Sequence, residues 1–484
     1  MQEKKKLPPV WLSFLPLIVL VLLLFFVLSA FGGDALSGAS QIALLVTSAC
    51  CILLGMAAKT MKWSDFEVSI NKHIGDVSQS ILILLLIGAV GGAWMISGIV
   101  PTMIYYGMQI ISPQWFLVSA CGICAAISVM TGSSWTTIAT IGIALLGIGK
   151  AQGFHEGWIA GAIISGAYFG DKISPMSETT VLASSTTQTP LFTHIRYMLY
   201  TTTPAFIIAL IVFTIKGLMN EPAGSENIGS FADGLSNVFN ISPWLLVVPL
   251  LTGIMISRRL PAIVILFMAT LMACIAAIVS QTALVDHIAD SHFGTWMNRF
   301  RGVMIIVYGN TAIDTGIPAL NELVATRGMS GMMSTIWLIF CAMTLGASMS
   351  AAGMIESIMR MFIRITHSTF SLVASTVSVG LFMNIVCADQ YLSIILTSNM
   401  FREHYKKLGY ESRLLSRTTE DAVTVTSVLI PWNTCGMTQS MVLGVSTLVY
   451  FPFCIFNYLS PVMSLIVAAA GYKIYRKSNQ DVKE

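Results

Sequence analysis

The segment GDKISPMSETT, residues 170–180, places polar side chains inside an otherwise apolar stretch of the chain. It contains the carboxylate of Asp171, a proline that breaks a helix and frees backbone carbonyls, and the hydroxyls of Ser174, Ser177 and Thr179. Oxygen ligands of these kinds suit a hard cation such as Na⁺. A desolvated carboxylate also takes up a proton when no cation is present, so Asp171 can bind either Na⁺ or H⁺. The segment therefore predicts an ion-exchange site.

Alternatives stay open for both acids of this segment. Asp171 can instead neutralise Lys172 or cap the helix that follows the break. Glu178 can be an ion ligand, or it can be a favourable charge in the first turn of that helix. A similar choice applies to Glu420 and Asp421, because Asp421 can reach the ion site whereas Glu420 can pair with Arg417.

Three other short segments carry polar side chains where the chain is otherwise apolar. TGSSW, residues 131–135, contributes Thr131, Ser133 and Ser134. CADQY, residues 387–391, contributes Asp389, and IPWNTCG, residues 430–436, contributes Asn433 and Thr434. We expect these residues to complete the ion site, with Asp171 and Asp389 as the two acidic Na⁺ ligands.

The composition is that of a membrane protein. Hydrophobic residues make up 55% of the chain and charged residues 10%, compared with a charged share of about 25% in ordinary soluble domains. Apolar segments recur along the whole length and predict about ten transmembrane helices. The expected fold class is an all-α polytopic membrane protein within the lipid bilayer. The net charge of +3 is too small to indicate a nucleic-acid partner.

Residues 115–149 and 369–400 do not fit as simple spans, because each has its polar break in the middle. Each half has roughly 15 residues, fewer than the ~20 that cross a bilayer as a helix. We expect both to be re-entrant hairpins, and we expect residues 157–189 and 414–447 to be discontinuous helices. Irregular backbone survives at this depth only where it is buried in protein or lines a wet cavity.

The same order of features occurs in both halves of the chain, and GGAWMISGIVPTMI from Gly91 aligns with LGASMSAAGMIESI from Leu345. The predicted repeats run in opposite directions, as in alternating-access transporters that bind substrates near the bilayer midplane. The predicted organisation is N-terminal helices and connector (1–76), first repeat (77–218), acidic external linker with helices and connector (219–330), second repeat (331–472) and cytoplasmic tail (473–484).

Residues 294–328 leave one alternative open. A crossing there makes the repeats parallel, whereas an interfacial helix plus loop keeps them inverted. Lys and Arg collect in cytoplasmic loops. With an interfacial helix at residues 294–328, the basic groups at residues 4–6, at residues 402–417 and in the tail all lie on the same side of the membrane. This distribution favours inverted repeats and places both termini in the cytoplasm.

The sequence contains no Walker A loop, dinucleotide-binding glycine motif or H-E-x-x-H motif. We therefore expect a transporter and not an enzyme, driven by an ion gradient, with Na⁺ and H⁺ as transported ions and without a cofactor. A homodimer is compatible with the sequence, although no pattern predicts one.

TGSSWTTIATIG, followed by GAIISGAYFGDKISPMSETT, resembles the hallmark region of the NhaC-type Na⁺/H⁺ antiporters, a family of the larger ion-transporter superfamily. The resemblance runs through GASMSAAGMIE to SRTTEDAVTVTSVLIPWNTCG near the end of the chain. It implies a bacterial inner-membrane location, Na⁺/H⁺ exchange, and ion-site roles for Asp171, Ser174 and Thr179. The chain has Glu178 where the family pattern SPMSDTT has aspartate, which keeps the carboxylate but lengthens its reach.

The same family contains malate/lactate exchangers coupled to Na⁺ and H⁺. Exchange of a small organic acid or an amino acid is therefore the second hypothesis. No arginine is placed in the expected core to clamp a dicarboxylate, which favours exchange of Na⁺ for H⁺.

Overall fold

The computed structural model describes residues 7–31, 38–219, 225–258, 260–290, 294–364, 366 and 368–476. The basic group predicted at residues 4–6 and the tail from residue 477 lie outside the described residues. Within them the chain is helical, with connecting loops and two isolated backbone bridges that join Thr311 to Thr326 and Tyr410 to Arg476. The predicted all-α class is confirmed.

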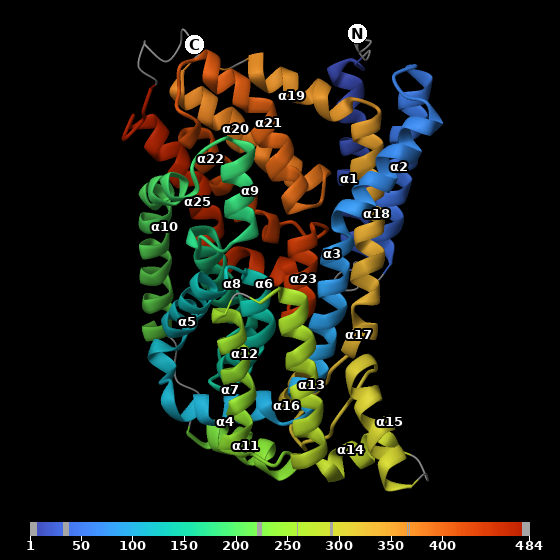
Figure 1. Ribbon diagram of the computed structural model, residues 1–484, viewed down its shortest axis with the longest axis vertical. Helices are drawn as coiled ribbons and strands as arrows, with labels where there is room; N and C mark the ends of the chain where they lie inside the picture. The colour runs from blue at the N-terminus through green and yellow to red at the C-terminus, as the bar shows by residue number, and fades with distance from the viewer. Residues whose placement is uncertain are drawn as a thin grey trace.

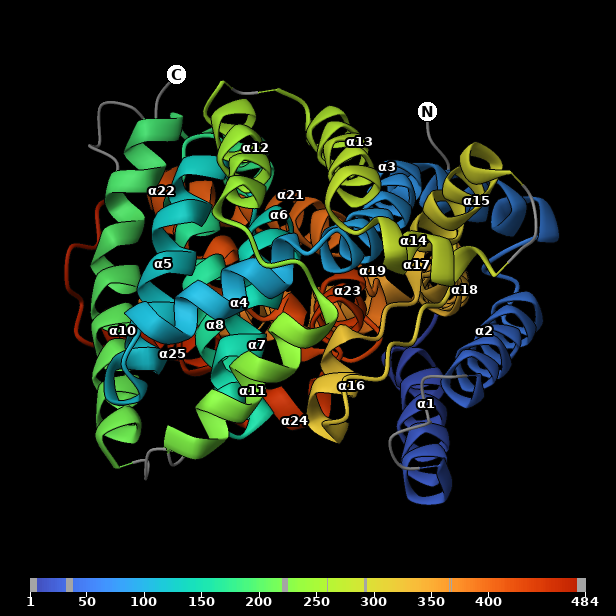
Figure 2. The same ribbon diagram turned by 90° about the horizontal axis from the view of Figure 1, so that it is seen from below.

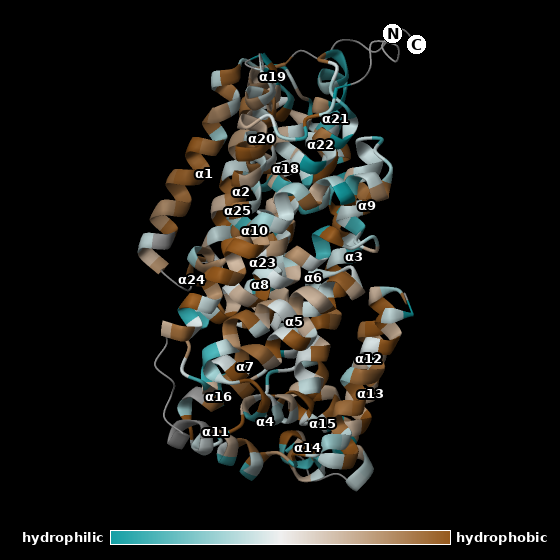
Figure 3. Ribbon diagram, turned by 90° about the vertical axis from the view of Figure 1, so that its left-hand side faces the viewer, coloured by the Kyte–Doolittle hydropathy of each residue, from teal (hydrophilic) through white to brown (hydrophobic). Residues whose placement is uncertain are grey.

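The described residues contain nine helices that are long and apolar enough to cross a membrane, or up to eleven if two bent helix pairs each count as one span. Figures 1 and 2 show α1 (Val10–Phe31) and α2 (Ala39–Ala57) at one edge and α10 (Leu191–Met219) at the opposite edge. Figure 3 shows α1 as hydrophobic along almost its whole length. Large apolar side chains on these outer helices, such as Phe25 and Ile211, are exposed, which suits contact with lipid.

The first repeat contains a hairpin and a broken helix. It starts with α3 (Trp63–Ile96), in which the expected connector and the first span form one continuous helix. The hairpin turns at residues 132–133, and the second helix breaks at residues 174–177. The elements are α4 (Ile99–Ile110), α5 (Phe116–Thr131), α6 (Ser134–Thr137), a π-helical segment (Ile138–Gly142), α7 (Ile143–Ala151), α8 (Glu156–Ile173) and α9 (Glu178–Thr186).

The second repeat has the same order of elements. Its hairpin turns at residues 387–389, and its broken helix is interrupted at residues 430–433. The elements are α18 (Met333–Ala351), α19 (Met354–Arg364), α20 (Thr369–Val386), α21 (Gln390–Lys407), α22 (Ser412–Thr419), a π-helical segment (Glu420–Thr424), a 3₁₀ turn (Ser427–Leu429) and α23 (Thr434–Leu443). The chain ends with α24 (Thr447–Tyr450) and α25 (Ile455–Ala469).

Seven described helices join the two repeats, and the 19-residue α13 among them is long enough to cross a membrane. They are α11 (Ser225–Val238), α12 (Val247–Ser257), α13 (Ala262–Ser280), α14 (Thr282–Ala289), α15 (Thr295–Tyr308), α16 (Pro318–Val324) and α17 (Gly328–Gly331). Residues 294–328 thus form a 14-residue helix, a loop and a 7-residue helix. Neither helix reaches the ~20 residues that cross a bilayer.

The two hairpins belong to opposite ends of the bundle. In Figure 1, α4 and α7 of the first repeat lie at the lower end, whereas α19 to α22 of the second repeat lie at the upper end. The polar breaks of both repeats consequently lie between the two ends, where they can meet.

We expect cysteines at Lys407 and Gln109 to be labelled from opposite sides of the membrane, because these exposed residues lie in α21 and α4, at opposite ends of the bundle. An impermeant thiol reagent applied to right-side-out and inverted vesicles measures this for Lys407→Cys and Gln109→Cys. The half-buried Cys50 and Cys274 are first replaced by Ser. Labelling of both positions from the same side would contradict the inverted arrangement.

Candidate functional site

Asp171 lies near the C-terminal end of α8, where groups from two parts of the first repeat surround its carboxylate. Its Oδ2 accepts hydrogen bonds from the Ser134 backbone N–H at 3.1 Å and from Ser134 Oγ at 2.6 Å. Its Oδ1 accepts one from Ser177 Oγ at 2.6 Å, and that hydroxyl lies 2.9 Å from Thr179 Oγ1. The hairpin tip and the helix break therefore meet at one carboxylate.

Two glycines allow this close approach. A Cβ atom on Gly170 would lie 2.4 Å from the carbonyl oxygen of Ala125 in α5, so only glycine lets α8 pack this near. At the hairpin tip, Gly132 has a φ of 69°, and a Cβ there would lie 2.6 Å from the carbonyl carbon of Met176. Glycine adopts this left-handed conformation without steric cost. The tip can consequently rest directly on the break.

A cavity of about 550 Å³ adjoins Asp171. Its walls come from α3, the first hairpin tip, the α8–α9 break, the turn between α12 and α13, and the start of α21. They carry three carboxylates, those of Asp76, Asp171 and Glu178, of which Asp171 alone is buried. No Lys, Arg or His is among the described residues that line the cavity. A wall of this charge attracts cations and repels anions.

The structure brings most of the predicted first-half residues together. The predicted residues that line the cavity are Thr131, Ser133, Asp171, Glu178 and Thr179. Ser134 and Ser177 contact Asp171 without lining the cavity. Ser174 instead donates a hydrogen bond to the Val129 carbonyl at 2.8 Å, which ties the end of α8 to α5. Glu178 accepts a hydrogen bond from the Tyr391 hydroxyl at 2.9 Å, so the first break also contacts the second hairpin.

The predicted second-half residues form a separate cluster, and none of them lines the cavity among the residues described there. Asp389 accepts hydrogen bonds from the Leu392 N–H at 2.9 Å and from Thr434 Oγ1 at 3.2 Å. Asn433 accepts one from the Cys435 N–H at 3.1 Å. Asp389 therefore caps α21 and joins the second hairpin tip to the second break.

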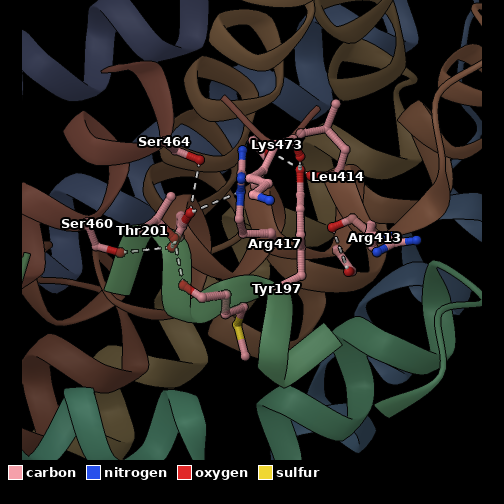
Figure 4. A network of polar contacts seen from close by, with 12 residues as sticks. Tyr197, Thr201, Arg413, Leu414, Arg417, Ser460, Ser464 and Lys473 are labelled. Atoms are coloured by element: carbon pink, nitrogen blue, oxygen red, sulfur yellow. Dashed lines mark hydrogen bonds and ion pairs between the residues drawn. The ribbon is translucent and has the colours of Figure 1, made fainter. Parts of the chain in front are cut away.

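A group of buried charges lies behind the first break. Lys172 forms an ion pair with Asp421, and both side chains are fully buried. The Arg417 Nε lies 3.9 Å from the second carboxylate oxygen of Asp421. Figure 4 shows hydrogen bonds converging on this carboxylate beside Arg417, and the donors are Thr201 at 3.1 Å, Ser460 at 3.1 Å and Ser464 at 2.9 Å.

This arrangement decides between alternatives that the sequence left open. Lys172 neutralises Asp421 and not Asp171. Asp421 is not among the described residues that line the cavity. The expectation that the core contains no arginine is wrong, because Arg417 is fully buried and pairs with Asp421, although it is not among the described residues that line the cavity. Within the described chain Glu420 makes no ion pair with Arg417.

Several cavity residues were not predicted from the sequence. Gln390 and Tyr391 line the cavity, and both belong to the CADQY motif, so that motif contained a signal for them. Asp76 and Gln79 lie on α3. They fall near the expected boundary between connector and first span, where no pattern marked them as part of a site.

The chain matches the Na⁺/H⁺ antiporter family over residues 2–187 and 166–472. It is 36% identical to the Na⁺/H⁺ antiporter NhaC of Alkalihalophilus pseudofirmus, over 86% of this chain and 87% of that protein. The chain belongs to the Na⁺/H⁺ antiporter family. The predicted family membership is thus confirmed, and this family member is a multi-pass membrane transporter.

Two further relatives of this antiporter-family chain have names that describe organic substrates. It is 33% identical to the malate-2H⁺/Na⁺-lactate antiporter of Bacillus subtilis, over 92% of both chains. It is 30% identical to the arginine/ornithine antiporter ArcD of Halobacterium salinarum, over 87% of this chain and 85% of that protein.

We expect Lys172→Met to lower the stability of the folded protein by about 3–5 kcal/mol, because it leaves the buried Asp421 carboxylate without its main partner. The double variant Lys172→Met/Asp421→Asn should recover part of the loss. Thermal unfolding in detergent measures both. Lys150→Met is the matched control, because its partly exposed pair with Glu156 at 3.4 Å contributes at most about 1 kcal/mol. Equal unfolding temperatures for Lys172→Met and the control would show that the buried pair is not needed.

Proposed function

We propose that the chain exchanges Na⁺ for H⁺ across the membrane by alternating access. The observation that carries this function is the Asp171 carboxylate, which is buried at a helix break, surrounded by hydroxyls, and part of an acidic cavity wall. When Na⁺ binds, it can take the place of the hydrogen bonds that the hydroxyls donate to this carboxylate. The hydroxyl groups then rotate so that their oxygen atoms coordinate the ion. A proton can occupy the same carboxylate oxygens. Competition for one group couples the movements of the two ions, and no cofactor takes part.

The individual residues have different roles in this exchange. Asp171 binds Na⁺ or H⁺, and the hydroxyls of Ser134, Ser177 and Thr179 supply further oxygen ligands. Thr131, Ser133 and Glu178 form the polar wall through which the ion arrives, and Ser174 holds the break in place. Asp389, Asn433 and Thr434 are the second candidate Na⁺ site, supported by their matching position in the second repeat.

We place the protein in the bacterial inner membrane with both termini in the cytoplasm. Support for this orientation comes from residues 402–417, whose many basic side chains belong to α21 and α22 at the upper end of the bundle in Figure 1, since such clusters stay on the cytoplasmic side. The similarity to the Na⁺/H⁺ antiporter NhaC of Alkalihalophilus pseudofirmus supports a bacterial membrane.

We expect Asp171→Asn to abolish Na⁺/H⁺ exchange, because an amide does not take up a proton in the working pH range. In the unsubstituted protein the apparent Na⁺ affinity should rise with pH until Asp171 is fully deprotonated, since protons then no longer compete. Dequenching of a pH-sensitive dye in vesicles that contain the protein measures both results.

Asp314→Asn is the matched control, because it makes the same chemical change on an exposed loop. There the Gly316 N–H and the Asn321 amide, which donate hydrogen bonds to the Asp314 carboxylate, hold its pKa below the ordinary value. This variant should exchange Na⁺ normally. A folded Asp171→Asn protein with the original exchange rate and pH profile would remove Asp171 from the site, and Glu178→Gln would be the next variant.

The volume of the cavity supports a second candidate function, the exchange of a small organic cation. About 550 Å³ falls within the roughly 300–1,000 Å³ of typical small-molecule pockets. The three carboxylates in the wall, with no basic side chain among the described lining residues, favour a cationic amino acid over a dianion such as malate.

We expect the vesicle assay to separate these functions. If Na⁺ is the sole substrate, addition of Na⁺ should move protons whereas arginine, ornithine, lactate and malate should not. Dequenching by arginine or ornithine would establish the second candidate. A response to malate or lactate would contradict the electrostatic preference inferred from the cavity wall.

A further inference from the structure

Glu420 is a buried carboxyl for which the exchange described so far has no use. It starts the π-helical segment Glu420–Thr424, and its side chain is fully buried. Its Oε1 accepts a hydrogen bond from Thr179 Oγ1 at 3.2 Å. The Thr424 hydroxyl lies near the same carboxyl, but Oε2 makes no hydrogen bond of normal geometry among the described residues. No described Lys, Arg or His forms an ion pair with Glu420. A buried carboxylate without a paired cation is strongly unfavourable unless a positive charge or a proton compensates it.

A continuous chain of hydroxyls connects Glu420 with Asp171. The contacts are 3.2 Å from Glu420 to Thr179, 2.9 Å from Thr179 to Ser177, and 2.6 Å from Ser177 to Asp171. Asp171 and Thr179 line the cavity, whereas Glu420 does not. A proton on Glu420 therefore has a hydrogen-bonded path to the cavity through two hydroxyls.

The buried charges around this chain do not balance. The fully or almost fully buried carboxyl, Lys and Arg side chains of this region are Asp171, Glu420, Asp421, Lys172 and Arg417, and the buried His194 adds no charge in its neutral form. Three acids and two bases leave a net charge of −1 when all are ionised. Asp389, the other buried acid among the described residues, belongs to the separate cluster at the start of α21. One proton or one Na⁺ is what the region needs to become neutral.

We propose that Glu420 and Asp171 form one proton-binding unit, which holds a single proton when Na⁺ is absent and releases it when Na⁺ binds at Asp171. This inference rests on the proposed Na⁺/H⁺ exchange and adds a second carboxyl to it. Glu420 supplies the uncompensated negative charge that makes the site require either ion, and the hydroxyls let the proton occupy either carboxyl.

The proton transfer along the chain balances. The Glu420 carboxylic acid gives its proton to Thr179 Oγ1, Thr179 gives its own to Ser177 Oγ, and Ser177 gives its own to the Asp171 carboxylate. Three O–H bonds break and three form, so both hydroxyls are restored. When Na⁺ reaches Asp171, the proton leaves to water in the cavity.

Other ionisable groups are packed around Glu420 on several elements. Lys172 and Asp171 act on it from α8, and Lys172 is paired with Asp421. The helices α20 and α25 contribute Tyr458 as their sole ionisable side chain. The remaining packed elements, α9, α10, α21 and α22, include Glu178, His194, Tyr405 and Arg417.

The test measures proton release when Na⁺ is added to purified, weakly buffered protein, together with the Na⁺ affinity at several pH values. The unsubstituted protein should release about one proton for each Na⁺ bound. In Glu420→Gln the remaining buried charges balance without a proton. We therefore expect this variant to release almost none, to bind Na⁺ roughly tenfold more weakly, and to lose the pH dependence of its Na⁺ affinity.

Two neighbouring threonines provide the controls. Thr419→Val changes a buried hydroxyl beside Glu420 that has no hydrogen-bond partner among the described residues, and it should release protons like the unsubstituted protein. Thr179→Val interrupts the hydroxyl chain and should slow proton release, whereas Thr179→Ser should restore it. These variants keep the test decisive even if Glu420→Gln does not fold.

Proton release by Glu420→Gln equal to that of the unsubstituted protein would overturn the role of Glu420 and leave the Na⁺/H⁺ exchange intact. Equally fast release by Thr179→Val would overturn the hydroxyl path. Absence of Na⁺-linked proton release from the unsubstituted protein would overturn both this inference and the proposed exchange.

Discussion

The constraint on which this structure depends is that a helix broken inside a membrane cannot satisfy its free backbone groups with water. Among the described residues, four helices begin at such breaks, and each begins with a side-chain cap. Ser133 accepts from the Thr136 N–H at 3.2 Å and Ser177 from the Thr180 N–H at 3.4 Å. Asp389 and Asn433 accept from N–H groups in the same way at 2.9 Å and 3.1 Å. The polar residues that interrupt the apolar sequence thus have a structural role, because they cap the free N–H groups at the helix breaks. The proposed ion site uses polar groups that these breaks bring together.

The two repeats meet this constraint with different chemistry. At the hairpin tips, Gly132 and Ala388 both have a positive φ, which carries a steric cost for alanine and none for glycine. In the second repeat the acid stands at the tip, where capping and the bond to Thr434 occupy the Asp389 carboxylate. In the first repeat the acid stands at the break, and Asp171 faces a cavity. One repeat therefore places its acid in a cavity wall, whereas the other places its acid where it also caps α21 and joins the hairpin tip to the break.

The sequence was sufficient for the features that depend on local pattern. Apolar segment lengths predicted the helical bundle, and the oxygen-rich segment 170–180 predicted that Asp171, Ser177 and Thr179 lie close together. The sequence did not predict which residues of the two halves pair with each other. Lys172 and Asp421 are 249 residues apart, and each could form an ion pair with several other charged residues. The contact between Tyr391 and Glu178, which are 213 residues apart, was not predicted for the same reason. Such contacts depend on how the two repeats dock, and periodicity within one repeat contains no information about docking.

Burial of an unequal number of acids and bases connects this docking with transport. Lys172 and Arg417 lie with Asp421 between the first break and the second repeat, so the docking of the halves neutralises part of the buried charge and leaves the remainder at Asp171 and Glu420. A region that carries a net negative charge when empty is costly to enclose in protein, and it becomes less costly once a proton or a cation is bound. If closure of the cavity is needed to change sides, the empty site closes rarely and the occupied site closes readily. Because the empty site closes rarely, the protein changes sides mainly with a bound ion. The unbalanced negative charge that selects cations therefore also favours exchange of one ion for another over one-way movement of a single ion.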